Sequence, residues 1–506
     1  MLTSTFKRTA LSSISRSSWT NSIRAYARSS ESIKDIQQQL QTFSIDPQHF
    51  QTELNTNDLL SLLKDRGLIA NNTAESDLSE ILEKGAKLGL YCGADPSARS
   101  LHLGNLLPLM LLLHFNIRGH SAFTLVGGAT GEVGDPSGRA TERDAMQEEV
   151  RLENVKRIKQ QMESFVKNGS RFVKSVNLSG SVIEEGPVEA VNNLDWWKDV
   201  TLLKFLSTYG RFIRVSSMLA RDSVKDRLTS EAGIGFNEFT YQILQAFDFY
   251  YLFKTNNVSI QLGGNDQWGN ITAGIDFINR VKPFDKKLAK KTAFGITVPL
   301  LTTASGAKFG KSAGNAVFID REMTPSFEIY QYFIKAQDSE VAKLLKIFTF
   351  IPLAQIETIM AKHNEDPSFR YAQRILAEQV TDLIHGVGSG KNANIITSIL
   401  YPFPDEAYPD ISTDSLVSAF KSANILKTLG KDQFFNKPYS VVLSEVQQIS
   451  RNEAKKLIKQ GGVYQGFNRV RIDESDDLLL TQESLIDERV LLLRVGKGKY
   501  HMVEFV

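Results

Sequence analysis

The stretch LGLYCGADPSARSLHLGN, residues 88–105, decides the expected fold. Residues 88–94 have the composition of a short strand, a polar loop follows, and an apolar helix begins at Leu106. Residues 121–131, SAFTLVGGATG, repeat the pattern of an apolar strand that runs into a glycine-rich turn. The order strand, loop, buried helix, strand is typical of a doubly wound, Rossmann-like α/β sheet, in which ligands bind at the carboxyl ends of the strands.

Further along the chain, residues 137–253 are mainly helical, and residues 258–270, VSIQLGGNDQWGN, form another strand followed by a polar turn. Neither of the two glycine clusters near the amino end completes the pattern G-x-G-x-x-G, so a dinucleotide fingerprint is absent. At 506 residues the chain exceeds what one core normally serves, and we expect about three domains.

Composition excludes several classes of protein. The net charge of +2 says nothing about nucleic acid, because binding depends on a local basic face. The single cysteine, Cys92, rules out an internal disulfide and argues against a cysteine-based zinc site. The most apolar run, residues 106–113, is shorter than the roughly 20 residues that a membrane span needs, so we expect no membrane segment.

The first thirty residues are rich in arginine and serine and contain no acidic residue. This composition predicts a mitochondrial transit peptide over residues 1–30, and the alternative is a disordered basic tail. Residues 31–56 are polar, and we expect them to form a lead-in to the first helix, which begins near Asn57 and ends at Gly67.

Residues 305–315, SGAKFGKSAGN, look like a phosphate-binding P-loop from which one residue is missing. Three residues separate Gly306 from Gly310 where a P-loop has four, and the run that follows is a poor helix. From these residues alone the stretch is a broken ATPase motif, a plain glycine turn, or another device for holding phosphate. A second glycine-rich stretch, HGVGSGKN at 385–392, has no strand before it, and we expect a loop between helices.

Two signatures taken together resemble a known class. H-x-G-N at 102–105 and KFGKS at 308–312 resemble the paired signatures of class I aminoacyl-tRNA synthetases. The resemblance is closer to bacterial-type tyrosyl-tRNA synthetases, whose blocks appear here in the same order and spacing from about residue 57 to the end. The blocks are YCGADPSARSLHLGN, LVGGATGEVGDPSGR, FNEFTYQILQAFDF, QLGGNDQWGNITAG and KFGKS.

The resemblance implies roles for the matched residues. It implies a tyrosine site in which Tyr91 and Asp248 hold the phenol. Asp135, Tyr241 and Gln245 would hold the α-amino group, and Gln261 and Gln267 would lie along the bound amino acid. It implies an ATP site made by Cys92, Asp95, His102, Asn105, Gly263, Asp266, Lys308 and Lys311. The catalytic set around the phosphates would be Ser97, His102, Arg139, Arg143, Lys308, Lys311 and Ser312. A phenol needs one hydrogen-bond donor and one acceptor, an ammonium group needs a carboxylate, and a leaving pyrophosphate needs cations. The residue types at these positions therefore suit the binding of tyrosine and ATP.

The chain departs from the family pattern at two places. Asn105 stands where the class has its last histidine, and an amide can still donate a hydrogen bond to a ribose oxygen. Phe309 and Gly310 stand where Met-Ser is common, but the lysines and the final serine of KFGKS remain.

The tail resembles a small RNA-binding module shared with a ribosomal protein. Arg451, Lys455, Lys456 and Lys459 fall on one face of a predicted helix over 451–460. The plain alternative is a solvated charged face, and the resemblance favours RNA binding. After that helix we expect short strands, the last two joined by a GKGK turn.

The resemblance therefore predicts a tyrosine-tRNA ligase of the mitochondrial matrix. Its substrates would be L-tyrosine, ATP with Mg²⁺ and tRNA(Tyr), without a protein-bound metal, and it would be a homodimer because Phe236 matches a position in the family's symmetric interface. The alternatives are an RNA-binding scaffold, such as an intron-splicing factor, and an enzyme specific for tryptophan. We expect residues 57–292 to form the catalytic domain and residues 293–323 to form a linker with KFGKS. Residues 324–425 would form an α-helical tRNA-binding domain, and residues 426–506 would form the RNA-binding module. In the first helix of the tRNA-binding domain, Thr324 would be the N-cap and Pro325 the first helical residue.

Overall fold

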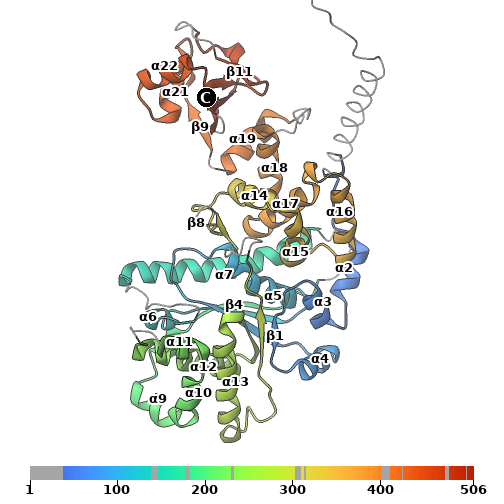
Figure 1. The fold of residues 1–506 in the computed structure, drawn as a ribbon, viewed down its shortest axis with the longest axis vertical. Coiled ribbons are helices and arrows are strands. Elements are labelled where there is room, and N and C mark those ends of the chain that lie inside the picture. Colours follow the sequence, from blue (N-terminus) through green and yellow to red (C-terminus); the bar gives the residue numbers. More distant parts are fainter. Residues whose placement is uncertain are drawn as a thin grey trace, which may run out of the picture.

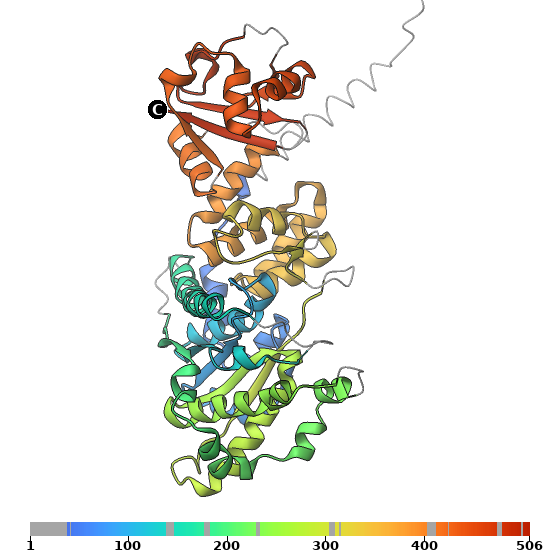
Figure 2. The same cartoon turned by 90° about the vertical axis from the view of Figure 1, so that its left-hand side faces the viewer.

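The fold is that of a computed structural model, which describes residues 38–40, 42–137, 146–176, 183–228, 233–302, 309–312, 315–401, 411–423, 425–472, 478–496 and 499–506. The predicted transit peptide lies outside these residues. The described chain forms three parts stacked along its longest axis (Figure 1, Figure 2). A sheet covered by helices lies at one end, a helical layer in the middle, and a small second sheet at the other end.

The first sheet has six strands in the order β1-β6-β5-β2-β3-β4. In sequence order they are β1 (Asn71–Asn72), β2 (Gly89–Ala94), β3 (Ser121–Val126), β4 (Val188–Asn192), β5 (Val258–Gly264) and β6 (Phe294–Val298). All neighbours are parallel except β1 and β6. The chain moves outward from β2 through β3 and β4, and then returns to the other side of β2 as β5. This reversal confirms the predicted doubly wound fold and places a crevice at the carboxyl ends of β2 and β5.

Helices cover both faces of this sheet. On one face lie α5 (Leu106–Asn116) and α7 (Glu148–Val176), and on the other lie α12 (Phe236–Thr255) and α13 (Trp268–Val281). Helix α5 is apolar all round and almost wholly buried, because the sheet lies on one side of it and the helical layer on the other.

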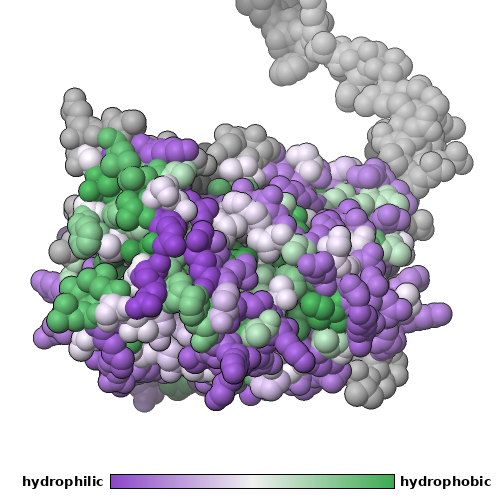
Figure 3. Space-filling model, turned by 90° about the horizontal axis from the view of Figure 1, so that it is seen from below, coloured by the Kyte–Doolittle hydropathy of each residue, from purple (hydrophilic) through white to green (hydrophobic). Residues whose placement is uncertain are grey.

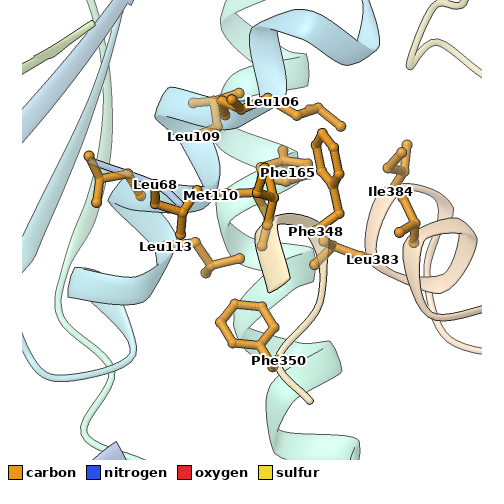
Figure 4. Packing of buried hydrophobic residues seen from close by; sticks show 14 of the residues in the cluster. Leu68, Leu106, Leu109, Met110, Leu113, Phe165, Phe348, Phe350, Leu383 and Ile384 are labelled. Atoms are coloured by element: carbon orange, nitrogen blue, oxygen red, sulfur yellow. The ribbon is translucent and has the colours of Figure 1, made fainter. Parts of the chain in front are cut away.

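The helical layer consists of α14 (Ser326–Ile334), α15 (Asp338–Phe348), α16 (Leu353–Glu365), α17 (Tyr371–His385) and α18 (Ser389–Leu400). Its core is continuous with the core of the sheet domain. Phe348, Phe350 and Leu383 from the helical layer point toward Met110 of α5 and Phe165 of α7 (Figure 4). The two parts therefore share one set of buried apolar contacts.

The second sheet has the order β11-β10-β12-β13-β9 and carries helices on both faces. Its strands are β9 (Leu426–Leu429), β10 (Val463–Gln465), β11 (Val470–Arg471), β12 (Val490–Val495) and β13 (Lys499–Phe505). One face is covered by α21 (Tyr439–Gln447) and α22 (Arg451–Lys459), the other by α18 and α19 (Thr413–Ser422). The predicted strand pair at the end of the chain is confirmed as β12 and β13.

The remaining described elements are short connections. They are α2 (Pro47–Leu54), α3 (Leu59–Asp65), α4 (Glu75–Glu83), α6 (Thr130–Val133), α8 (Leu194–Trp197), α9 (Leu202–Thr208), α10 (Val215–Leu219), α11 (Asp222–Leu228), β7 (Lys311–Ser312), β8 (Asn315–Ala316) and α20 (Lys431–Phe434). Helix α2 falls within the expected polar lead-in, and its Phe50 and Leu54 are buried in the shared core. Among the described helices, none has the length and apolar character that crossing a membrane requires.

Two predicted helix starts are wrong by one or two residues. Helix α14 begins at Ser326 with Pro325 as its N-cap, because the Thr324 hydroxyl instead accepts the backbone N–H of Phe318 at 3.0 Å. Helix α3 is capped by the carboxylate of Asp58, which accepts the N–H of Ser61, and not by Asn57.

Within the glycine-rich stretch 385–392, residues 386–388 join α17 to α18, which confirms the predicted connection between helices, while residues 389–392 already form the first turn of α18. Gly386 and Gly388 have φ values of 93° and 91°, which only glycine adopts without strain. The Asp382 carboxylate accepts the Gly390 N–H at 2.6 Å, so a carboxylate of the chain itself occupies the start of α18 where a phosphate would bind.

Candidate active site

A cavity of about 490 Å³ opens at the carboxyl ends of β2 and β5, where the sheet reverses. All the predicted tyrosine-site, ATP-site and catalytic residues whose side chains are described line this one cavity. They are Tyr91, Cys92, Asp95, Ser97, His102, Asn105, Asp135, Tyr241, Gln245, Asp248, Gln261, Gly263, Asp266 and Gln267. Arg139, Arg143 and Lys308 lie outside the described residues, and only the backbone of Lys311 and Ser312 is described, in β7.

Tyr91 and Asp248 lie at the inner end of the cavity, and each side chain is 2 % exposed. The Tyr91 hydroxyl has no hydrogen-bond partner among the described residues. Burial, and then the charge of Asp248, raise the pKa of Tyr91 well above its usual value, so the phenol is a neutral donor. Burial also raises the pKa of Asp248 to about 7, against the opposing effect of three hydrogen-bond donors.

Those three donors were missed by the sequence analysis. Asn193 donates to Asp248 Oδ2 at 2.9 Å, and the indole N–H groups of Trp196 and Trp197 donate to Oδ1 at 2.8 and 2.7 Å. They follow β4 directly, in the run NNLDWW at 192–197. An amide and two adjacent tryptophans at the carboxyl end of a parallel strand are a signal that could have pointed to this site.

A second polar cluster lies nearer the mouth of the cavity. Gln267 Nε2 donates to Asp135 Oδ2 at 2.8 Å, and Gln245 Nε2 donates to Gln267 Oε1 at 3.3 Å. The buried Oε1 atoms of Gln245 and Gln261 have no partner among the described residues. Asp135 is 8 % exposed and acceptor-rich, so this cluster suits an ammonium group. Asn270, which donates to Gln267 Oε1 at 3.1 Å, was not predicted.

The end of β2 is packed closely against the turn after β3. The Tyr241 hydroxyl donates to Asp95 Oδ2 at 3.1 Å, and the Thr130 hydroxyl donates to Oδ1 at 3.0 Å. A side chain at Gly127 would place its Cβ 2.2 Å from Asp95 Oδ1, so this position requires glycine. Burial raises the pKa of the Cys92 thiol to about 12, which keeps it neutral beside the ligand space.

The two class signatures touch each other. His102 pairs with Phe318 in an antiparallel bridge, and the Leu103 N–H donates to the Val317 carbonyl at 3.0 Å. A Cβ at Gly104 would lie 2.9 Å from the His102 ring and 3.5 Å from the Phe309 carbonyl, so glycine allows this approach. Segments two hundred residues apart in the sequence thus form one wall of the cavity.

Both departures from the family pattern fit their surroundings. Phe309 is 8 % exposed, and its ring stacks on Phe348 with a centroid distance of 5.4 Å, so it anchors the KFGKS segment in the shared core. Gly310 has a φ of 83°, and its N–H donates to the Tyr332 hydroxyl at 3.0 Å. Asn105 Oδ1 accepts the His102 N–H at 3.0 Å, which directs the amide N–H groups away from the backbone.

The basic residues predicted to bind RNA lie on α22, in the last of the three parts (Figure 1). Arg451, Lys455, Lys456 and Lys459 are all exposed, while Ala454 and Ile458 on the other side of the helix are buried. The helix therefore presents a basic face to solvent in a different part of the molecule from the ligand cavity.

Comparison with known proteins identifies the class. Residues 83–401 match the family described as tRNA synthetases class I (W and Y). The chain is 47 % identical over 454 residues to the mitochondrial tyrosine--tRNA ligase of Saccharomyces cerevisiae, covering 90 % of each chain. It is 39 % identical over 464 residues to that of Drosophila melanogaster, covering 90 % of this chain and 96 % of the relative.

Among solved structures, a C-terminally truncated mitochondrial tyrosyl-tRNA synthetase from Aspergillus nidulans superimposes with a TM-score of 0.62 at 33 % identity. The match covers 73 % of this chain and 99 % of that one. With its doubly wound sheet and paired signatures at one cavity, the chain belongs to the class I aminoacyl-tRNA synthetases for tryptophan and tyrosine. Within that group it is a tyrosyl-tRNA synthetase of the mitochondrial and bacterial type.

Proposed function

We propose that the chain activates L-tyrosine with ATP to give tyrosyl-adenylate and then transfers tyrosine to tRNA(Tyr) for protein synthesis in the mitochondrial matrix. One observation carries the choice of tyrosine. A buried hydroxyl without a partner among the described residues, that of Tyr91, lies with the carboxylate of Asp248 at the inner end of the cavity. A phenol that donates to Asp248 and accepts from Tyr91 satisfies both groups, whereas the single donor of an indole satisfies one.

The first step joins two bound substrates. The tyrosine carboxylate attacks the α-phosphorus of ATP. The bond between this phosphorus and the oxygen that bridges the α- and β-phosphates breaks, and pyrophosphate leaves with that oxygen. The attacking group is already ionised, so no general base is required, and orientation with charge stabilisation supplies the acceleration. Asp135 and the Gln245–Gln267 pair would hold the ammonium group, so that the carboxylate points toward the ATP site.

ATP would lie along the wall made by the two signatures. We propose that Cys92, Asp95, Asn105, Gly263 and Asp266 face the nucleoside, since all line the cavity. Mg²⁺ would arrive with ATP as part of the substrate, held mainly by phosphate oxygens. The phosphates themselves would be met by Ser97, His102, Arg139, Arg143, Lys308, Lys311 and Ser312.

The second step needs the tRNA to reach from one end of the molecule to the other. We propose that residues 324–425 and 426–506 bind the tRNA body while its terminal ribose hydroxyl attacks the adenylate carbonyl at the cavity. The exposed basic face of α22 supports an RNA-binding role. Replacing Lys455 and Lys456 with glutamate should weaken tRNA charging, reduce its salt dependence and spare adenylate formation. Normal charging by this double variant would show that α22 is not the RNA contact.

An apolar surface supports the proposed homodimer. Leu202, Leu203 and Leu206 of α9 are 71 %, 80 % and 55 % exposed, and Phe236 at the start of α12 is 80 % exposed. In Figure 3 apolar side chains gather on the side of the molecule where α9, α10 and α11 lie in Figure 1. Surfaces of this kind mark protein interfaces. Phe236→Asp should yield monomers in sedimentation analysis, while Phe284→Asp, at another exposed phenylalanine, should leave the oligomer unchanged.

Mitochondrial location agrees with the yeast and fruit-fly relatives, both of which are named as mitochondrial. Residues 1–30 fused to a fluorescent reporter should direct it to mitochondria, and a diffuse cytosolic signal would contradict the transit-peptide prediction.

The function is tested by amino-acid-dependent exchange of pyrophosphate into ATP, run separately with all twenty amino acids. We expect tyrosine to support exchange and phenylalanine and tryptophan to support little. Exchange that is strongest with tryptophan, or absent with every amino acid, would overturn the proposal.

A further inference from the structure

We propose that Trp197 is a positioning residue that, together with Trp196, fills Oδ1 of Asp248 and so leaves this carboxylate one open accepting position, on Oδ2, for the phenol of the substrate. The inference rests on the proposed function, because it assigns a role within the tyrosine site. It concerns a residue that lines no part of the cavity and acts only through Asp248.

A carboxylate offers about four accepting positions, two on each oxygen. Trp196 Nε1 lies 2.8 Å from Oδ1 and Trp197 Nε1 lies 2.7 Å from the same atom. Asn193 Nδ2 lies 2.9 Å from Oδ2. Three positions are therefore occupied, and the position that remains is on Oδ2, the oxygen that carries a single donor.

The donors are held in place by their own surroundings. Trp196 stacks on Tyr251 with a centroid distance of 4.5 Å and an interplanar angle of 16°. Trp197 packs against Phe247 at 4.7 Å and Phe205 at 5.5 Å. None of these contacts involves the ligand cavity, so the indole N–H groups are aimed before substrate arrives.

The orientation of Asn193 is fixed in the same way. Its Oδ1 accepts the backbone N–H of Ala129 at 2.7 Å, so Nδ2 must be the end that faces Asp248 and the Thr130 hydroxyl. Asn193 is fully buried, and it cannot rotate without leaving the Ala129 N–H unpaired.

This arrangement decides where a proton can sit. A proton on Oδ1 would face two N–H donors, and a proton on Oδ2 would take the open position that the phenol needs. Burial and the charge of Asp95 raise the pKa of Asp248, the neighbouring Tyr91 stays neutral, and the three donors oppose the rise. Removing one donor should therefore raise the pKa further and make the carboxylate a poorer acceptor at neutral pH.

The test replaces Trp197 with phenylalanine, which keeps an aromatic ring against Phe205 and Phe247 and removes the N–H. Tyrosine affinity and the ratio of kcat/KM for tyrosine over phenylalanine are measured from pH 5.5 to 9 in pyrophosphate exchange and equilibrium dialysis. The pH below which tyrosine affinity falls should move upward in Trp197→Phe. At pH 7 the ratio should drop roughly tenfold or more, the effect of losing one hydrogen bond to a charged group.

A matched control separates the N–H from packing. Phe205→Leu loosens the same aromatic contacts but keeps the indole, and it should leave the pH midpoint in place. An unchanged midpoint in Trp197→Phe, or an equal shift in Phe205→Leu, would overturn the inference.

A measurement on the unaltered protein covers the case in which Trp197→Phe does not fold. The chain has four tryptophans, so its indole ¹⁵N–¹H signals are few enough to assign. The chemical shifts of the Trp196 and Trp197 indole N–H groups should change with pH at the same midpoint as the Asp248 carboxyl signal. A Trp197 shift that does not change as Asp248 ionises would refute the contact. Failure of the unaltered protein to activate tyrosine would instead refute the proposed function, whatever the indole signals do.

Discussion

The Tyr91→Phe variant is the sharpest test of the amino acid site, because it deletes one oxygen atom that has no hydrogen-bond partner among the described residues. Tyr91 Oη makes no hydrogen bond with the described residues, so its removal breaks no hydrogen bond with them in the folded state. The melting temperature should therefore change little, which makes the variant suitable for kinetic comparison. Asp248→Ala is less clean, since it would strand the donors of Asn193, Trp196 and Trp197.

The magnitude follows from two effects that act in the same direction. Bound tyrosine loses a neutral hydrogen bond from Tyr91, worth about 0.5–1.5 kcal/mol. In the variant, bound phenylalanine no longer leaves the buried Tyr91 hydroxyl unpaired, which removes a desolvation penalty of about 1–3 kcal/mol. Their sum, about 1.5–4.5 kcal/mol, should lower the preference for tyrosine roughly ten- to thousand-fold.

The assay is kcat/KM for tyrosine and for phenylalanine in pyrophosphate exchange, with the melting temperature as a control. Tyrosine should become a poorer substrate and phenylalanine a better one. Equal losses for both amino acids would point to general damage, and an unchanged ratio would place the phenol elsewhere and undo the assignment of the inner end of the cavity.

Three further predictions concern other parts of the chain. Lys311→Ala should raise the activation free energy of adenylate formation by about 2–4 kcal/mol, as measured in pre-steady-state assays, while tyrosine affinity changes little. Equal effects on the rate and on the affinity would argue against a role at the leaving pyrophosphate. Removing residues from about 430 onward should leave adenylate formation intact and impair tRNA charging; full charging by a folded truncated enzyme would show that the last domain is dispensable. Glu238→Ala should lower the free energy of unfolding by about 3–5 kcal/mol, because it removes the carboxylate that lies 2.7 Å from the Arg227 guanidinium and balances its charge, with both side chains buried. Urea denaturation checks this value, and a loss below about 1 kcal/mol would mean that water reaches the guanidinium.

Much of the fold could be predicted because local patterns and tertiary structure agree. The strand of residues 88–94, the turn after it and the apolar helix from Leu106 all lie where the alternation of apolar runs and glycine turns placed them. Many of the cavity residues lie in or just after β2 and β5, and parallel strands bring these carboxyl ends to one edge, whereas Tyr241, Gln245 and Asp248 come from α12.

The position of Asn193, Trp196 and Trp197 after β4 could have pointed to the site, but their hydrogen bonds to Asp248 could not be found from the sequence. In the sequence pattern Trp196 and Trp197 count as apolar residues. Their role in the site depends on the indole N–H of each, and the direction of these N–H groups depends on how the short helix α8 packs against α12. Helix α14 was placed too early because Thr324 is a good cap by composition, yet its hydroxyl is engaged by Phe318. Contacts between distant segments decided both cases, and a local pattern contains no information about them.

The continuous core between the sheet domain and the helical layer has a thermal consequence. Because Phe348 and Phe350 are buried among residues of α5 and α7, neither part can open without exposing the apolar face of the other (Figure 4). We expect the two to melt in a single cooperative transition. The last sheet has apolar clusters of its own, one of them shared with α18 and α19 and contacted by Phe327 of α14, so we expect it to melt separately. Heat would then unfold the last sheet first, and if this sheet binds the tRNA as proposed, the remaining folded part would still make adenylate but no longer charge tRNA.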